Sequence, residues 1–269
     1  MKRALFSVSI CVVMILVVVA ACSSAAAEQS PAAAKKKKET KQQTTTVPLY
    51  SLSLMREAVV LMQQGRYDTA LERFQEADRV APGNATNYNM MGLCYLQQGE
   101  FDQALGQFDK ALQLVPLFTD ARNNRGATYL AMRQYHLAEV DFIAVLGDST
   151  YPHAKQVHYN LGLTHLERGH LGAAEESFRR SVVAPNPVFD GYIQLSSIAQ
   201  RHGELERSVV LLEEAQLNFP EAIEVSLELG KVLILMGRGE EARPYLEQVI
   251  AHDPNSDFAT SARNLLDVS

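Results

Sequence analysis

The chain has 269 residues, 47% of them hydrophobic, no Trp and a formal net charge of −6. From residue 50 onward, 18 Lys and Arg stand against 29 Asp and Glu, a net charge of −11 that argues against nucleic acid as a partner, because phosphate contacts need positive charge. The sequence has no glycine-rich phosphate loop, nucleophile elbow or His-Glu-x-x-His motif. We therefore expect no catalytic residues, metal, cofactor or small-molecule substrate.

Residues 1–21 have the charge and length of a secretory signal, with a short positive start before an apolar run over residues 4–21. The run ends in Val19-Ala20-Ala21-Cys22, which resembles the bacterial lipobox. That resemblance implies acylation of Cys22 and, because Ser23 and not Asp follows, a lipid anchor in the outer membrane with the repeats in the periplasm. The alternative is an uncleaved membrane anchor, since this apolar run is just long enough to span a bilayer.

Residues 22–49 are rich in Lys, Thr and Ala and have little to bury, which predicts a disordered tether. Such a tether has a typical reach of roughly 30 Å, at about 5 to 6 Å times the square root of its length. Two interpretations of its lysines at 35–38 and 41 are open: they lie on anionic headgroups or cell wall, or they are solvated.

The remainder of the chain repeats itself about every 34 residues, a period typical of stacked helix pairs. Six repeats are expected, over 51–84, 85–118, 119–154, 155–188, 189–222 and 223–256. The third is two residues longer, around Gly147–Pro152. A last helix over 257–269 is expected to cap the array through Phe258, Ala262, Leu265 and Leu266.

The repeat over 85–118 resembles the tetratricopeptide consensus at Tyr88, Met91, Gly92, Tyr95, Gly99, Phe101, Ala104, Phe108, Ala111 and Pro116. Gly92 and Ala104 are small where two helices cross closely, and Pro116 ends the second helix. The resemblance implies an all-α solenoid: a right-handed superhelix of six helix-turn-helix repeats plus the capping helix. Cys94 falls at a helix position that faces its neighbours, so we expect a small core residue.

In this repeat family the first helix of each pair lines the concave face. Eight residues there are predicted to form a protein-binding groove: Met55, Val59, Met62, Asn89, Leu93, Leu96, Asn123 and Leu130. Apolar side chains that face water usually mark a binding site, and the two asparagines are suited to hold peptide backbone. Two alternatives are that the tether folds over the groove, or that the superhelix turns these residues into neighbouring helices.

His158 and His165 share one face of a predicted helix. They occupy positions where the repeat pattern requires large packing side chains, so a structural role is favoured over a metal site.

Together, the lipobox, the tether, the six repeats and the lengthened third repeat before Tyr151-Pro152 and Tyr159-Asn160-Leu161-Gly162 resemble the type IV pilus pilotin lipoproteins, over residues 22 to about 256. This resemblance implies a non-enzymatic lipoprotein that binds the pilus secretin and promotes its outer-membrane targeting and multimer assembly, and so pilus biogenesis and motility. The alternatives are a general periplasmic scaffold that organises cell-wall enzymes or an outer-membrane assembly machine, and a regulatory adaptor for a protease.

Overall fold

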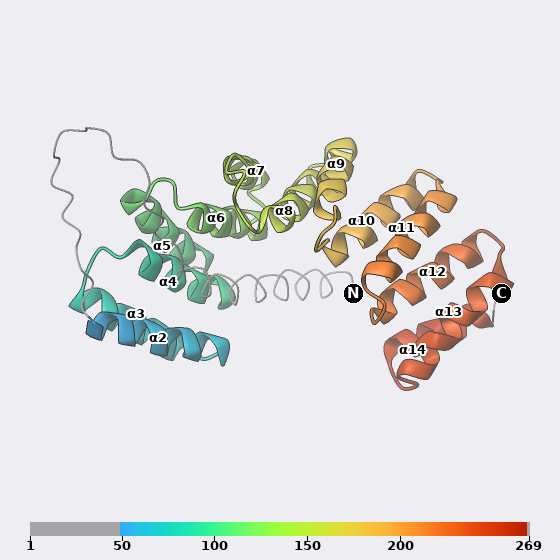
Figure 1. Cartoon of the computed structure of the whole chain (residues 1–269), viewed down its shortest axis with the longest axis horizontal. Helices are drawn as coiled ribbons and strands as arrows, with labels where there is room; N and C mark the ends of the chain where they lie inside the picture. Colours follow the sequence, from blue (N-terminus) through green and yellow to red (C-terminus); the bar gives the residue numbers. More distant parts are fainter. Residues whose placement is uncertain (1–48, 268–269) are drawn as a thin grey trace. The chain divides into compact units, whose positions relative to one another are not determined.

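The computed structural model describes residues 49–267, and this range contains thirteen α-helices and no strand (Figure 1). The helices are α2 (Leu49–Gln63), α3 (Tyr67–Val80), α4 (Ala85–Gln97), α5 (Phe101–Leu114), α6 (Thr119–Ala131), α7 (Tyr135–Leu146), α8 (Ala154–Glu167), α9 (Leu171–Ser181), α10 (Phe189–Arg201), α11 (Leu205–Asn218), α12 (Ile223–Leu235), α13 (Gly239–His252) and α14 (Asp257–Leu266). The expected all-α array of six pairs and a last helix is confirmed. The predicted signal, Cys22 and the tether up to residue 48 lie outside the described residues.

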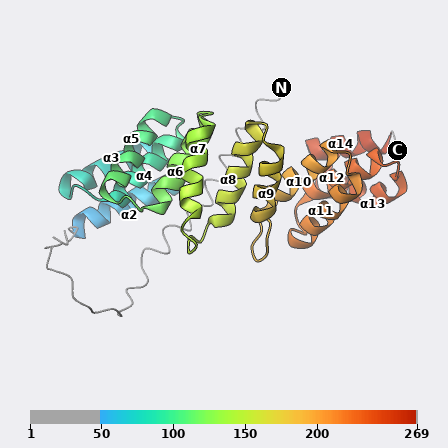
Figure 2. The same ribbon diagram turned by 90° about the horizontal axis from the view of Figure 1, so that it is seen from above.

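The chain divides into two compact units, with the boundary inside α6. Unit 1 ends at Thr128 and contains α2 to α5 and most of α6. Unit 2 begins at Tyr129 and contains α7 to α14. Within each unit the two helices of a pair pack side by side, as α8 and α9 do in Figure 2. The right-handed superhelix stays a prediction.

Glycine in the first helix of a pair lets the second helix approach its backbone. A Cβ atom added at Gly92 would lie 2.5 Å from Cε1 of Phe108, and one at Gly162 would lie 2.6 Å from the ring of Phe178. Both rings are fully buried, so they lie directly against the helix backbone. The close crossing expected at Gly92 is confirmed.

The turn inside a pair depends on a residue with positive φ. Gly65 and Gly99 have φ of 73° and 78°, a region that glycine enters without a steric penalty. In the third pair Arg133 takes this place with φ of 59°. The turn therefore keeps its geometry in all three pairs, even where the glycine is missing.

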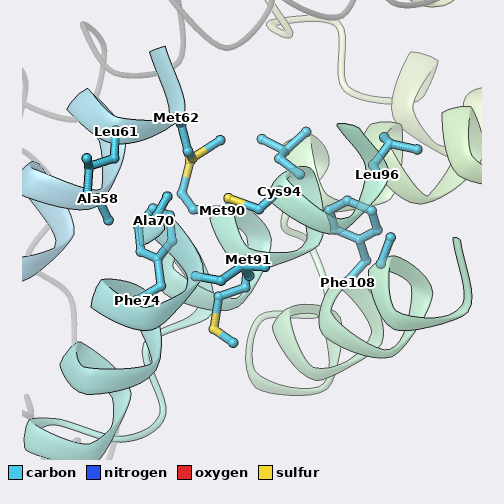
Figure 3. Close-up of a cluster of buried hydrophobic side chains, with 13 residues drawn as sticks. Ala58, Leu61, Met62, Ala70, Phe74, Met90, Met91, Cys94, Leu96 and Phe108 are labelled. Carbon is cyan, nitrogen blue, oxygen red and sulfur yellow. The ribbon is translucent and has the colours of Figure 1, made fainter. Parts of the chain in front are cut away.

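The core of unit 1 is a cluster shared by α2, α3, α4 and α5, with Phe74, Met91 and Phe108 among its members (Figure 3). Cys94 is fully buried within it, as expected, and burial raises the pKa of its thiol to about 12. The thiol is therefore protonated at neutral pH and inert.

At the other end of the array, α14 packs against α12 and α13. Ala262 is fully buried, and Leu265 and Leu266 pack against the same cluster. Phe258 is 40% exposed, however, and Ala259 is the fully buried residue of this turn. Ala259 and Ala262, three residues apart, lie on one face of α14 and are its buried residues, and the Ser256 hydroxyl caps the helix start by accepting a hydrogen bond from Ala259 N at 3.1 Å.

Candidate protein-binding surface

The predicted groove residues of unit 1 lie on the first helices of its pairs. Met62, Leu93 and Leu96 are buried and belong to the core cluster, where Figure 3 labels Met62 and Leu96. Met55 and Val59 are partly buried and pack against the same cluster. The structure thus brings these five side chains together, but the expectation that they all face water fails for the three that pack among neighbouring helices. Their part in binding stays a prediction, and Met55 and Val59 are its accessible members.

The two predicted asparagines are both buried, and they differ in whether the side-chain oxygen has a hydrogen-bond partner. Asn89 Oδ1 accepts a hydrogen bond from Asn124 Nδ2 at 3.0 Å, which links α4 to α6. Asn123 is 4% exposed, and its Oδ1 atom has no hydrogen-bond partner among the described residues. A buried acceptor without a partner costs roughly 1–3 kcal/mol, and because this atom is enclosed by the protein, a bound peptide could reach it only after neighbouring side chains move.

Leu130 is not part of this group. It lies in unit 2, where it packs against the cluster that contains Tyr159 and Leu163. Within unit 1, the accessible part of the candidate surface therefore consists of Met55 and Val59 on α2, because Met62, Leu93, Leu96 and the two asparagines are buried.

The two histidines of α8 lie in the packed part of unit 2. Burial lowers the pKa of both His158 and His165, and neither Nδ1 atom has a hydrogen-bond partner in residues 49–267. His165 Nδ1 lies 3.8 Å from Glu139 Oε1 on α7. In this same range no group of three or more His, Cys, Asp and Glu side chains is placed to hold a metal ion. Nor is any helix in it both long and apolar enough to cross a bilayer.

A second apolar surface was missed at the sequence level. It is the outward face of α7, where Leu137, Val140 and Ile143 are exposed. A comparison of α7 with the second helices of the neighbouring pairs could have revealed this surface from the sequence. The equivalent positions are Gln103, Gly106 and Asp109 in α5, and Ala173, Glu176 and Arg179 in α9. Most of these equivalents are polar or charged, so the outward face of α7 departs from the pattern of its neighbours.

Family models of the Tetratricopeptide repeat match residues 50–116, 123–187 and 199–265. Among solved structures, the chain is similar to PilW, a widely conserved type IV pilus biogenesis factor, with a TM-score of 0.69 and 21% identity over 80% of this chain and 98% of that one. It is also similar to Pseudomonas aeruginosa pilF, with a TM-score of 0.68 and 16% identity over 82% and 98%.

A third similar structure is YrrB, a TPR protein with an unusual peptide-binding site, with a TM-score of 0.53 and 20% identity over 72% of this chain and 99% of that one. The search of curated proteins gives no match. At these identities the likeness concerns the fold.

Proposed function

Because this chain is a tetratricopeptide-repeat protein, we propose that it binds the type IV pilus secretin as a non-enzymatic lipoprotein and promotes targeting of that secretin to the outer membrane and its assembly into multimers. Arrays of this kind are scaffolds for protein–protein interaction: they stack helix pairs into extended surfaces that bind other proteins. The finer assignment, to the pilus, needs support of its own.

The observation that carries the pilus assignment is the likeness to PilW and pilF, each matched over 98% of its length by one array with six helix pairs. The lipobox at Cys22 supports it from the sequence, since a lipid anchor is the part that delivers cargo to a membrane. The lengthened turn between α7 and α8, which contains the buried Tyr151, supports it further.

Each part of the chain has a role in this proposal. Acyl chains on Cys22 fix the destination, because several acyl chains hold a protein durably in a bilayer. The tether lets the repeats search roughly 30 Å around the anchor. The surface of unit 1 then binds a secretin segment, to which Met55 and Val59 supply apolar contact.

The test is deletion of the gene, followed by electrophoresis of unheated outer-membrane samples and detection of secretin multimers and total secretin monomer. We expect the multimers to disappear while monomer is retained. The wild-type gene should restore them, and the Cys22→Ala variant should not.

Normal multimers in the deletion strain would contradict the pilus assignment and leave the general periplasmic scaffold as the function. Restoration by Cys22→Ala would contradict the role of the anchor alone.

A further inference from the structure

Exposed apolar side chains gather at one edge of unit 1, where α2, α4 and α6 begin and where α3 and α5 end. We call this the tether edge, because the chain enters the described structure there. Its exposed members are Leu49, Tyr50, Val80, Leu114, Val115 and Leu117. Leu49 is 84% exposed and Leu117 is 88% exposed, so neither has a packing role in unit 1.

Contacts between successive helix ends show that these residues share one edge. Tyr50 donates a hydrogen bond to Glu76 at 3.0 Å, which joins the start of α2 to the end of α3. Tyr88, at the start of α4, packs in a cluster with Leu112 near the end of α5 and with Phe118 before α6. The same helix ends lie along the left side of unit 1 in Figure 1.

The turn after α5 makes the tether edge apolar. The segment Val115-Pro116-Leu117-Phe118 occupies the place held by Ala81-Pro82-Gly83-Asn84 after α3 and by Asp253-Pro254-Asn255-Ser256 after α13. The turn that is small or polar after α3 and α13 is thus apolar after α5. The opposite edge of unit 1 carries polar turns, Gln63-Gln64-Gly65-Arg66 and Gln97-Gln98-Gly99-Glu100.

The tether edge also differs in charge from the rest of the repeats. Its charged residues are Glu76, Asp78, Arg79, Lys110, Asp120 and Arg122, three acidic and three basic. It is therefore neutral on a body that is acidic as a whole. Anionic headgroups repel an acidic surface, and a neutral apolar edge avoids that repulsion.

We propose that the tether edge contacts the bilayer in which the chain is anchored. This inference rests on the proposed lipid anchor at Cys22, which precedes Leu49 by a tether of roughly 30 Å reach. Since the tether joins the body at this edge, the edge is the part of the body held closest to the membrane. Leu49, Val115 and Leu117 enter the headgroup region, and Tyr50 lies at the interface, where its ring contacts lipid and its hydroxyl keeps its hydrogen bond to Glu76.

This contact would act as a second membrane signal beside the acyl chains, and it would orient unit 1 with its helix ends toward the lipid. The surface around Met55 and Val59 lies along α2 and would stay open to a partner in the periplasm.

The absence of Trp from the sequence gives a direct test. Leu117→Trp places a single indole at the tether edge without touching the core, and Gln64→Trp places one at the exposed opposite edge as the matched control. Each lipidated full-length variant is reconstituted into vesicles of phosphatidylethanolamine and phosphatidylglycerol, with and without brominated acyl chains. Flotation of the chain with the vesicles measures separately whether the lipid anchor holds the chain on the bilayer.

We expect the indole at position 117 to emit at shorter wavelength in the lipidated chain on vesicles than in the Cys22→Ser chain in vesicle-free buffer. We also expect brominated lipid to quench this emission. The indole at position 64 should do neither. A chain that floats with the vesicles while position 117 stays unquenched overturns the tether-edge contact alone. A short-wavelength emission already present without vesicles means protein contact and also overturns it. A lipid-processed chain that fails to float contradicts the anchor and, with it, this second contact.

Discussion

Replacement of Gly92 by Ala sets two effects of known sign against each other. In a helix interior Ala is favoured over Gly by about 1 kcal/mol. The new Cβ would lie 2.5, 2.7 and 2.8 Å from three atoms of the Phe108 ring, which is fully buried, so the ring or the helices must shift. Overpacking of this kind costs about 1–3 kcal/mol, and the three contacts place it near 3. We therefore expect a net loss of about 2 kcal/mol in the free energy of unfolding, because the clash outweighs the helix propensity.

Gly106 provides the matched control on the partner helix α5. It is exposed, and a Cβ there meets no atom of residues 49–267 within 4 Å, so Gly106→Ala should raise stability by up to about 1 kcal/mol. Urea denaturation followed by far-UV circular dichroism measures both variants. If Gly92→Ala unfolds at the same or a higher urea concentration than the wild type, the direct packing of Phe108 on the α4 backbone is refuted.

Three further predictions concern buried and accessible groups. Cys94 should not react with a thiol reagent in the native state, because burial raises its pKa to about 12, and should react on unfolding; rapid native labelling would contradict its burial. Burial lowers the pKa of His158 and His165, so below the ordinary histidine value of about 6.5 the unfolded chain binds more protons than the folded chain. The free energy of unfolding therefore decreases as the pH is lowered through this range. The urea midpoint of His158→Phe should therefore depend less on pH than that of the wild type, and an equal dependence would exclude this cause. Met55→Glu with Val59→Glu should weaken secretin capture in a pull-down while far-UV circular dichroism is unchanged, since an apolar contact disfavours two charges; the same change on the outward face of α7 is the control.

The helix pairs could be predicted because their determinants are local. Gly92 and Phe108 are recognisable by size and spacing, and the turn glycines mark where each first helix ends. Cys94 was assigned to the core for the same reason. Arg133 shows the limit of this approach, because its positive φ appears where the sequence has no glycine.

The candidate surface was less predictable, because position within a repeat tells which way a side chain points but not what fills the space beyond it. Leu93 and Leu96 were expected to face a partner, yet the structure buries both. Asn123 and Asn124 adjoin in the sequence, but only the contact with Asn89 tells them apart: Asn124 donates to it, and Asn123 Oδ1 is left without a partner among residues 49–267. Burial and hydrogen bonding between successive pairs are tertiary properties, which one repeat does not encode.

The central claim is that the first helices of unit 1 hold the pilus secretin. A photo-reactive amino acid in place of the half-buried Val59 on α2, compared in living cells with one in place of the exposed Glu72 on α3, tests it most directly. The account predicts a crosslinked product that contains secretin at position 59 and none at position 72. Secretin captured at neither position, or only at position 72, would contradict it.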